Sequence, residues 1–182
     1  MSVPRPAVSP EAFRRLVGRW ATGVSVVTGR DAEGDVGLTV NALLSVALSP
    51  PLLLVSLSRD ADSTPVVDRT GAFGVSVLTA EQRSLSERFA QPASAAEKFD
   101  GVAGHRGPGG LFLLDDSLAA FECRVTERYP VADHILFIGE VVHAEPGSDA
   151  APLVFYRSRY AEAAGTDRLT LPAPGAGPRH PY

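Results

Sequence analysis

Residues 37–64 read GLTVNALLSVALSPPLLLVSLSRDADST, and this stretch decides both the fold and the binding chemistry that the sequence predicts. Its apolar runs, broken at Pro50-Pro51, predict a strand, a turn and a second strand, followed by a polar loop that opens a short helix. Hydroxyl and amide side chains recur along it at Thr39, Asn41, Ser45, Ser56, Ser58, Ser63 and Thr64. No strong nucleophile accompanies them, which favours binding of a polar, phosphate-bearing molecule that brings its own chemistry.

The overall composition is that of a globular domain. The chain has 182 residues, 45% of them hydrophobic and 21% charged, which suits one domain with a sizeable core. Its net charge of −4 argues against a nucleic-acid partner, because no basic surface attracts phosphates. The apolar run 51–55 falls far short of the roughly 20 residues of a membrane span. The N-terminal MSVPRPAVSP lacks the apolar centre of a signal peptide.

Cysteine and histidine are too sparse for a disulfide framework or a metal site. Cys123 is the only cysteine, which excludes an internal disulfide and favours a reducing, cytoplasmic setting. The residues around it, Phe-Glu-Cys-Arg, predict a small buried hydrophobe rather than a reactive thiolate. No pair of His or Cys residues has metal-ligand spacing, so we predict no metal.

The first predicted helix begins at Ser9-Pro10-Glu11, where a hydroxyl cap, a first-turn proline and an acid favour a helix start. Apolar residues then follow the i, i+3, i+4, i+7 spacing of a buried helix face, at Phe13, Leu16, Val17 and Trp20. We therefore expect this face to pack on the core, and the helical region to end at Gly23.

Strands dominate the rest of the chain. The expected strands are 24–28, 38–44, 52–58, 73–77, 119–127, 135–142 and 153–156. The first two should form a hairpin around the turn at 31–35, and 119–127 should pair with 135–142 around 129–133. Short helices are expected at 64–71 and, from a Thr79–Gln82 capping box, at 79–89, and residues 101–110 are an expected irregular loop. This spacing favours a barrel over alternating βαβ units.

The chain divides by composition near residue 165. From Thr166 it turns rich in Pro and Gly and cannot bury a core. We therefore predict a domain at 1–165 and an extended C-terminal tail at 166–182.

An ordered set of segments carries a family resemblance: FRRLVGRWATGVSVVT, the 37–64 stretch, FGVSVL, SERFA, KFDG, FECRV, ADHILFIGEVV and FYRSRY. The chain resembles the flavin reductase family, the short-chain NAD(P)H:flavin oxidoreductases. The resemblance implies a mainly β protein with short helices, built as an FMN-binding split β-barrel of Greek-key type, and a homodimer with pockets near the subunit seam. It covers about Phe13 to Tyr160.

Two positions depart from the family pattern. Ala132 precedes Asp133-His134 where the family usually has Gly, and Ala42 follows Asn41 where the family often has Ser. Alanine allows fewer backbone conformations than glycine, so the turn at Ala132 is expected to be set differently. Ala42 removes one hydroxyl from the expected pocket.

The resemblance implies two flavin contacts at strand ends. Thr39, Val40, Asn41 and Ala42 would face the isoalloxazine ring and ribityl chain; alternatively, Asn41 only stabilises a turn. Ser56, Leu57 and Ser58 would border the pyrimidine edge of the ring; alternatively, they form a solvated strand edge.

The flavin phosphate is expected at the start of the helix after residue 62. Ser63 and Thr64 precede Pro65, and the first N–H groups of a helix are a natural anion site. An ordinary helix cap by Thr64 is the alternative, and the two are compatible. Lys98 and Arg59 are further candidates for the phosphate charge, against the alternative that each is a solvated side chain.

Three further positions have open roles. Phe89 is placed beside the cofactor by the resemblance, or in the core with Leu85 by spacing. His134 is the candidate catalytic residue, positioning or polarising the nicotinamide. The closing segment with Tyr156, Arg157 and Tyr160 covers the cofactor or the dimer seam, or packs as surface.

The function that the resemblance implies is hydride transfer from NADH or NADPH to FMN or FAD, with reduced flavin released to a partner monooxygenase. The protein would supply proximity and orientation, which agrees with the lack of an acid/base pair in the sequence. Two alternatives stay open: a flavoprotein with tightly bound flavin that passes electrons to another acceptor, and a flavin-binding protein that does not turn over.

Overall fold

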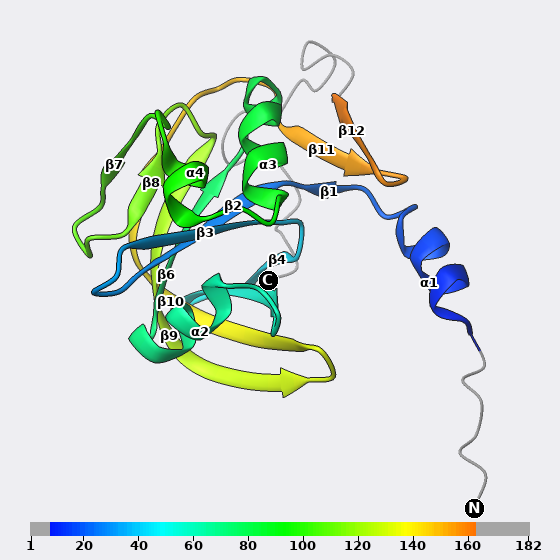
Figure 1. Cartoon of the computed structure of the whole chain (residues 1–182), viewed down its shortest axis with the longest axis horizontal. Coiled ribbons are helices and arrows are strands. Elements are labelled where there is room, and N and C mark those ends of the chain that lie inside the picture. Colours follow the sequence, from blue (N-terminus) through cyan, green and yellow to red (C-terminus); the bar gives the residue numbers. More distant parts are fainter. Residues whose placement is uncertain (1–7, 163–182) are drawn as a thin grey trace, which may run out of the picture.

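A seven-stranded, fully antiparallel sheet forms the body of the protein (Figure 1). The computed structural model describes residues 8–162, so the predicted tail from 166 and the domain end at 165 lie outside the described residues. In spatial order the strands are β3 (Asp35–Val40), β2 (Ser25–Arg30), β6 (Ala72–Val77), β9 (Ala119–Val131), β10 (His134–Pro146), β5 (Pro51–Ser58) and β4 (Leu43–Leu48).

Two smaller sheets complete the strand content. The first pairs β1 (Thr22–Gly23) with β11 (Leu153–Tyr156), which in turn pairs with β12 (Arg159–Glu162). The second is the hairpin of β7 (Gly104–Arg106) and β8 (Phe112–Leu114). Because β1 lies near the N-terminus and β12 near residue 162, the first sheet brings the two ends of the domain together.

The helices are short and lie outside the main sheet (Figure 1). They are α1 (Pro10–Val17), α2 (Ser63–Thr70), the 3-10 turn η1 (Ala80–Gln82), α3 (Arg83–Ala90) and α4 (Ala95–Phe99). The Thr79–Gln82 capping box is confirmed, with the Thr79 backbone N–H donating to Gln82 Oε1 at 3.1 Å. It opens a 3-10 turn before α3 rather than one continuous helix. No helix among the described residues is long and apolar enough to cross a membrane.

Two hydrophobic clusters form the core. One is built inside the sheet around Val27, Val55, Phe73 and Phe137. The other lies under α3 and α4, where Phe89 stacks edge-on against Phe99. Burial of these side chains provides the main driving force for the fold.

The predicted strand 38–44 is wrong in its extent. The chain leaves β3 at Val40, crosses through Asn41-Ala42, and enters β4, which pairs with β5 instead of β2. The apolar residues run on without a break because both strands are partly buried, so periodicity alone does not reveal the crossing.

Two predicted connections are also shorter or more ordered than expected. The turn predicted at 129–133 is only Ala132-Asp133, since β9 continues to Val131 and pairs with β10 from His134. The predicted irregular loop 101–110 contains β7, which is held by backbone pairing with β8. Short strands held by tertiary contacts leave little trace in the local sequence.

The predicted burial of the first helix is wrong. α1 ends at Val17, and its apolar side chains Phe13 and Leu16 are exposed, as is Trp20 after the helix. Figure 1 shows α1 standing away from the main sheet. The helical spacing is confirmed as far as Val17, but Trp20 lies outside the helix and the core does not cover these side chains.

Candidate functional site

Three secondary-structure elements meet at one end of the main sheet: β5 ends there, and β10 and α2 begin there. Ser58 and His134 are opposite each other in the β5–β10 pairing. The Thr64 hydroxyl donates to the Ser58 carbonyl at 2.5 Å, and the Arg59 backbone N–H donates to the Asp133 carbonyl at 2.9 Å. The structure therefore brings together Ser58, Thr64 and His134, which are distant in sequence.

Ser63 has the environment of an unfilled polar site. Its side chain is buried at the first turn of α2, and its Oγ finds no hydrogen-bond partner among the described residues. Buried hydroxyls are normally paired, so an unpaired one beside a helix start is what an anionic ligand would satisfy. Thr64 does not cap the helix, because its hydroxyl is used by Ser58 and the N-cap position is Asp62.

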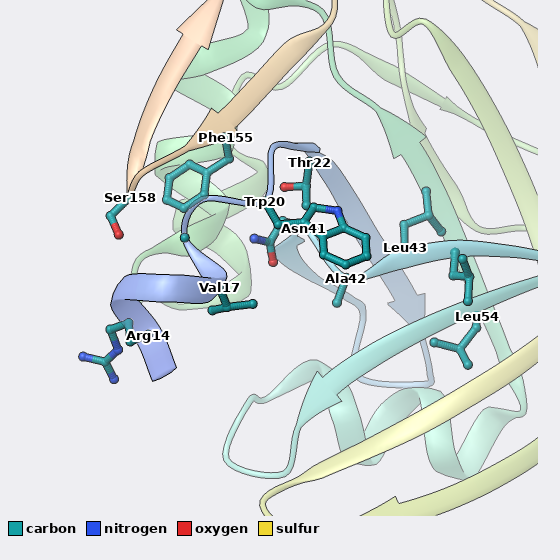
Figure 2. Close-up of a pocket in the computed structure, with 12 residues that line it drawn as sticks. Arg14, Val17, Trp20, Thr22, Asn41, Ala42, Leu43, Leu54, Phe155 and Ser158 are labelled. Carbon is teal, nitrogen blue, oxygen red and sulfur yellow. The ribbon is translucent and has the colours of Figure 1, made fainter. Parts of the chain in front are cut away.

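A cavity of about 530 Å³ opens beside the Asn41-Ala42 crossing (Figure 2). It is walled mainly by apolar side chains from α1, β4, β5 and β11, with Trp20, Leu43, Leu54 and Phe155 among them. Thr22 also lines it, and its Oγ1 is buried without a partner among the described residues. An apolar hollow with few polar groups is the ordinary form of a small-molecule site.

The remaining strand-end residues face in different directions. Val40 and Leu57 are buried in the core. The Ser56 backbone N–H donates to the Ala42 carbonyl at 3.2 Å, which links the 39–42 and 56–58 segments. The Thr39 hydroxyl, by contrast, donates to the Ser86 carbonyl at 2.7 Å, on the side covered by α3.

Lys98 and Phe89 lie under the helices rather than at this edge. Lys98 is only 7% exposed, and its Nζ donates to the Gly37 carbonyl at 3.2 Å. Phe89 is fully buried, with its ring centroid 5.0 Å from that of Phe99. No described hydrogen bond joins either residue to Ser63 or Thr64, and Phe89 occupies the core position that its spacing favoured.

His134 sits at a solvent-accessible position with one ring nitrogen held. Its side chain is 44% exposed, and Nδ1 lies 2.8 Å from Asp133 Oδ1. This hydrogen bond, together with the nearby imidazole charge, holds the pKa of the Asp133 carboxyl below its usual range. Ala132 adopts the left-handed φ of 49°, so alanine here takes the backbone conformation that glycine favours.

Cys123 and its neighbour Glu122 have structural roles. Burial, with a smaller effect from the Glu122 charge, raises the pKa of the Cys123 thiol to about 12, which leaves it unreactive. Glu122 is buried and accepts backbone N–H groups of Gly109 at 2.7 Å and Leu111 at 2.9 Å. It thereby fixes the loop between β7 and β8. No group of three or more His, Cys, Asp or Glu side chains within residues 8–162 is arranged to hold a metal ion.

The sequence suggested that the segment from Tyr156 to Tyr160 covers the cofactor, but it did not indicate that α1 and Ser158 line one cavity. Arg14, Val17, Trp20 and Ser158 all line the 530 Å³ cavity. The apolar face of α1 was predicted to pack on the core, because an apolar helix face does not by itself reveal which surface will cover it. Ser158 lies in a turn whose pairing with α1 has no local signal.

Comparison with known proteins identifies the family of this chain. The family described as "Flavin reductase like domain" matches residues 17–164. The chain is 42% identical over 154 residues to the NADH-dependent FMN reductase AsuE2 of Streptomyces nodosus subsp. asukaensis, covering 81% of this chain and 82% of that one. It is 35% identical over 150 residues to the reductase component of 4-hydroxyphenylacetate 3-monooxygenase of Thermus thermophilus, covering 82% and 94%.

A solved structure has the same fold. The NADH:FAD oxidoreductase SgcE6 of Streptomyces globisporus C-1027, in complex with NAD and FAD fragments, superposes with a TM-score of 0.82 at 32% identity, covering 89% of this chain and 99% of that one. The match to the family spans most of the chain, and its relatives are matched over nearly their whole length. The chain therefore belongs to the flavin reductase like domain family.

Proposed function

We propose that this protein is an NAD(P)H-dependent flavin reductase that takes up FMN or FAD at the edge where β5, α2 and β10 meet. The observation that carries the proposal is the buried, unpaired Ser63 hydroxyl at the start of α2, next to strand ends rich in hydroxyl and backbone groups. These groups fit a phosphate and a polar ring. The names of the matched relatives support the same reaction class.

Different residues of the site contact different parts of the flavin. Ser63 receives the phosphate, and Thr64, whose hydroxyl and backbone N–H are both used within the protein, holds the end of β5 in place beside it. Ser56 to Ser58 border the ring, and the Asn41-Ala42 crossing contributes backbone groups beside the apolar cavity. Flavin, when bound, supplies the hydride-accepting chemistry. The protein orients the two substrates and excludes water from their contact, which is where the rate gain arises.

His134 positions the nicotinamide. It lies directly across from Ser58, and Asp133 holds its Nδ1, which directs Nε2 to solvent. Val40, Leu57, Thr39, Lys98 and Phe89 support the site from behind, because their side chains are buried or bonded within the protein. This refines the expected contact set toward backbone groups and small hydroxyls.

We also propose that the protein is a homodimeric split β-barrel, which acts in the reducing cytoplasm and gives reduced flavin to a monooxygenase component. The similarity to the Thermus thermophilus protein, which is the reductase component of a monooxygenase, supports the last point. The exposed apolar residues of α1 and of the edge strand β4 support the dimer, since such a surface is costly to leave in water.

A turnover assay tests the proposal. Purified protein is mixed with NADH or NADPH and with free FMN or FAD, and the loss of reduced nicotinamide is followed. Oxidation that requires added flavin supports a reductase. Oxidation with a stoichiometric bound flavin and another acceptor would instead support the tightly bound flavoprotein, and no oxidation with any pair would overturn the proposal.

A further inference from the structure

A small hollow lined by arginines adjoins the apolar cavity. It has a volume of about 270 Å³ and is lined by Arg15, Gly18, Arg19, Arg157 and Ser158. Two of these arginines come from the end of α1 and one from the turn between β11 and β12, nearly the whole length of the domain apart. We call this group of residues the arginine pocket.

The arginine pocket concentrates positive charge on an acidic protein. The chain has a net charge of −4. Yet within residues 8–162 none of Arg15, Arg19 and Arg157 lies within 4.0 Å of a carboxylate oxygen. The negative end of the α1 dipole accounts for an arginine in its last turn. It does not account for Arg157, which arrives from a distant segment. The Arg157 guanidinium lies over the Tyr156 ring, 5.2 Å from its centroid, and this contact leaves its positive charge without an anionic partner among the described residues.

The turn that carries Arg157 has an energetically unfavourable backbone conformation. Arg157 and Ser158 have φ values of 51° and 60°, in the left-handed region that Asn and Gly normally occupy in a two-residue hairpin. The Arg157 backbone N–H also donates to the Gly18 carbonyl at 2.6 Å, which fastens the turn to the end of α1. Arginine and serine held in strained positions at a pocket mouth are typical of a functional site.

The arginine pocket is continuous with the proposed cofactor region. Gly18 and Ser158 line both the arginine pocket and the 530 Å³ cavity. Figure 2 shows Ser158 of this shared wall, with Phe155 and Arg14 of the 530 Å³ cavity near it. An apolar cavity followed by three guanidinium groups matches a molecule whose flat ring system is joined to phosphates.

We propose that the arginine pocket binds the pyrophosphate of a dinucleotide substrate, whose ring system lies in the adjoining cavity. This rests on the proposed function for the identity of the substrate, which is NAD(P)H. The phosphate that FMN and FAD share is proposed at α2, so the pyrophosphate left for the arginine pocket is that of the nicotinamide cofactor.

Equilibrium binding of ADP tests the site without turnover. Trp20 is the only tryptophan of the chain, follows Arg19 and lines the cavity, so its fluorescence reports on this region. We expect ADP to change this fluorescence saturably and inorganic pyrophosphate to compete. Arg157→Asn and Arg15→Gln should each weaken ADP binding by about tenfold, the effect of losing one charge-assisted hydrogen bond.

The variants are chosen to separate binding from folding. Asn is at ease in the left-handed conformation, so Arg157→Asn should preserve or raise the melting temperature while it weakens ADP. Arg69→Gln is the matched control: it removes the same charge from α2, whose Arg69 pairs with Asp31, and should bind ADP normally. No ADP response, or equal ADP affinity in wild type and Arg157→Asn, would overturn the proposal.

Kinetics then test the source of the pyrophosphate. With FMN as acceptor, Arg157→Asn should raise the KM for NADH or NADPH and leave the KM for FMN unchanged. A rise in the KM for FAD alone would overturn the assignment to the nicotinamide cofactor. If wild type oxidises no nicotinamide at all, the proposed function fails, while the ADP measurement still decides whether the pocket binds a pyrophosphate.

Discussion

Three residues at the candidate site have features that suit ligand binding better than they suit the stability of the free protein. Ser63 is buried with an unpaired hydroxyl, Ala132 takes a left-handed backbone, and His134 is exposed with one nitrogen held. Each departs from what the fold alone would favour. Such departures are expected where a protein gives up some stability for a function.

His134 is predicted to act on the nicotinamide and not on the flavin. His134→Ala should raise the KM for the nicotinamide by about tenfold, through loss of a positioning hydrogen bond, and leave the KM for flavin nearly unchanged. Steady-state kinetics with each substrate varied in turn measure both values. His143→Ala, at the other end of β10, is the control; an unchanged nicotinamide KM in His134→Ala would refute the assigned role.

Ser63 and Thr64 should respond differently to removal of their hydroxyls. Ser63→Ala removes an unpaired buried hydroxyl, so the free protein should be as stable or slightly more stable, while FMN binding weakens by about tenfold. Thr64→Val breaks the bond to the Ser58 carbonyl, so it should lose about 1 kcal/mol of stability. Urea unfolding and FMN titration measure the two effects. Loss of stability without loss of FMN affinity in Ser63→Ala would contradict the phosphate site.

Ala132 is predicted to be a site of backbone strain. A left-handed residue other than Gly, Asn or Asp costs about 1–2 kcal/mol. Glycine relieves this strain, but its larger unfolded-state entropy offsets part of the gain. Ala132→Gly should therefore raise the free energy of unfolding by about 0.5–1 kcal/mol. Thermal and urea unfolding measure it, with Ala32→Gly as a control outside this turn. A fall in stability would show that the turn is not strained.

At the scale of elements, the β7–β8 hairpin is held by side chains from three directions. Arg106 forms a bidentate pair with Asp35 of β3, at 2.6 and 2.5 Å. Glu122 of β9 accepts two backbone N–H groups of the connecting loop. His105 joins Asp115 at 2.7 Å to Glu145 of β10 at 3.0 Å. These contacts explain how a glycine-rich segment becomes ordered.

The His105 bridge predicts a pH dependence of stability. Hydrogen bonding to Asp115, with the charge of Glu145, raises the pKa of His105 above its usual value. The bridge therefore stabilises the folded state fully below about pH 6.5 and loses this effect as the pH rises through the folded-state pKa. Melting temperatures of wild type and His105→Asn should differ most below about pH 6.5 and converge as the pH rises above the folded-state pKa of His105. A gap that widens with pH would contradict the bridge.

The local sequence predicted those helices and strands whose boundaries are marked by their own residues. The Ser9-Pro10-Glu11 start and the Thr79–Gln82 box mark helix starts that the structure contains, and 153–156 matches β11. The crossing at Asn41-Ala42 and the strand β7 were missed because tertiary pairing decides them. The family resemblance supplied the order of segments, which periodicity alone could not.

At the scale of the whole molecule, the site is assembled from both ends of the domain. α1 and the β11–β12 turn meet through Arg157 and Gly18, and together they wall the cavity that the central strands leave open. The cluster of hydroxyls in the sequence directed attention to residues 37–64, and the family resemblance directed attention to His134; the roles of both stay predictions. The sequence did not predict the arginine pocket, since two charged segments far apart in the chain give no sign that they will meet.

The exposed apolar surface predicts self-association. Phe13 on α1 and Leu48 on the edge strand β4 are 62% and 67% exposed, and edge strands readily pair with another chain. Wild type should sediment as a dimer in analytical ultracentrifugation, and Phe13→Lys with Leu48→Lys should shift it to monomer. Ala32→Lys, in the β2–β3 turn, adds charge elsewhere and should stay dimeric. A monomeric wild type at micromolar concentration would contradict the proposed dimer.

Cys123 lies on β9 in the middle of the main sheet, buried between neighbouring strands β6 and β10. Because it is the chain's single sulfhydryl, labelling by a thiol reagent can occur only when the centre of the sheet opens. The labelling rate therefore reports the opening free energy of the sheet centre directly, without added fluorophores. Comparing the labelling rate with and without bound substrates would show whether ligand binding at the end of the sheet changes the opening free energy at its centre.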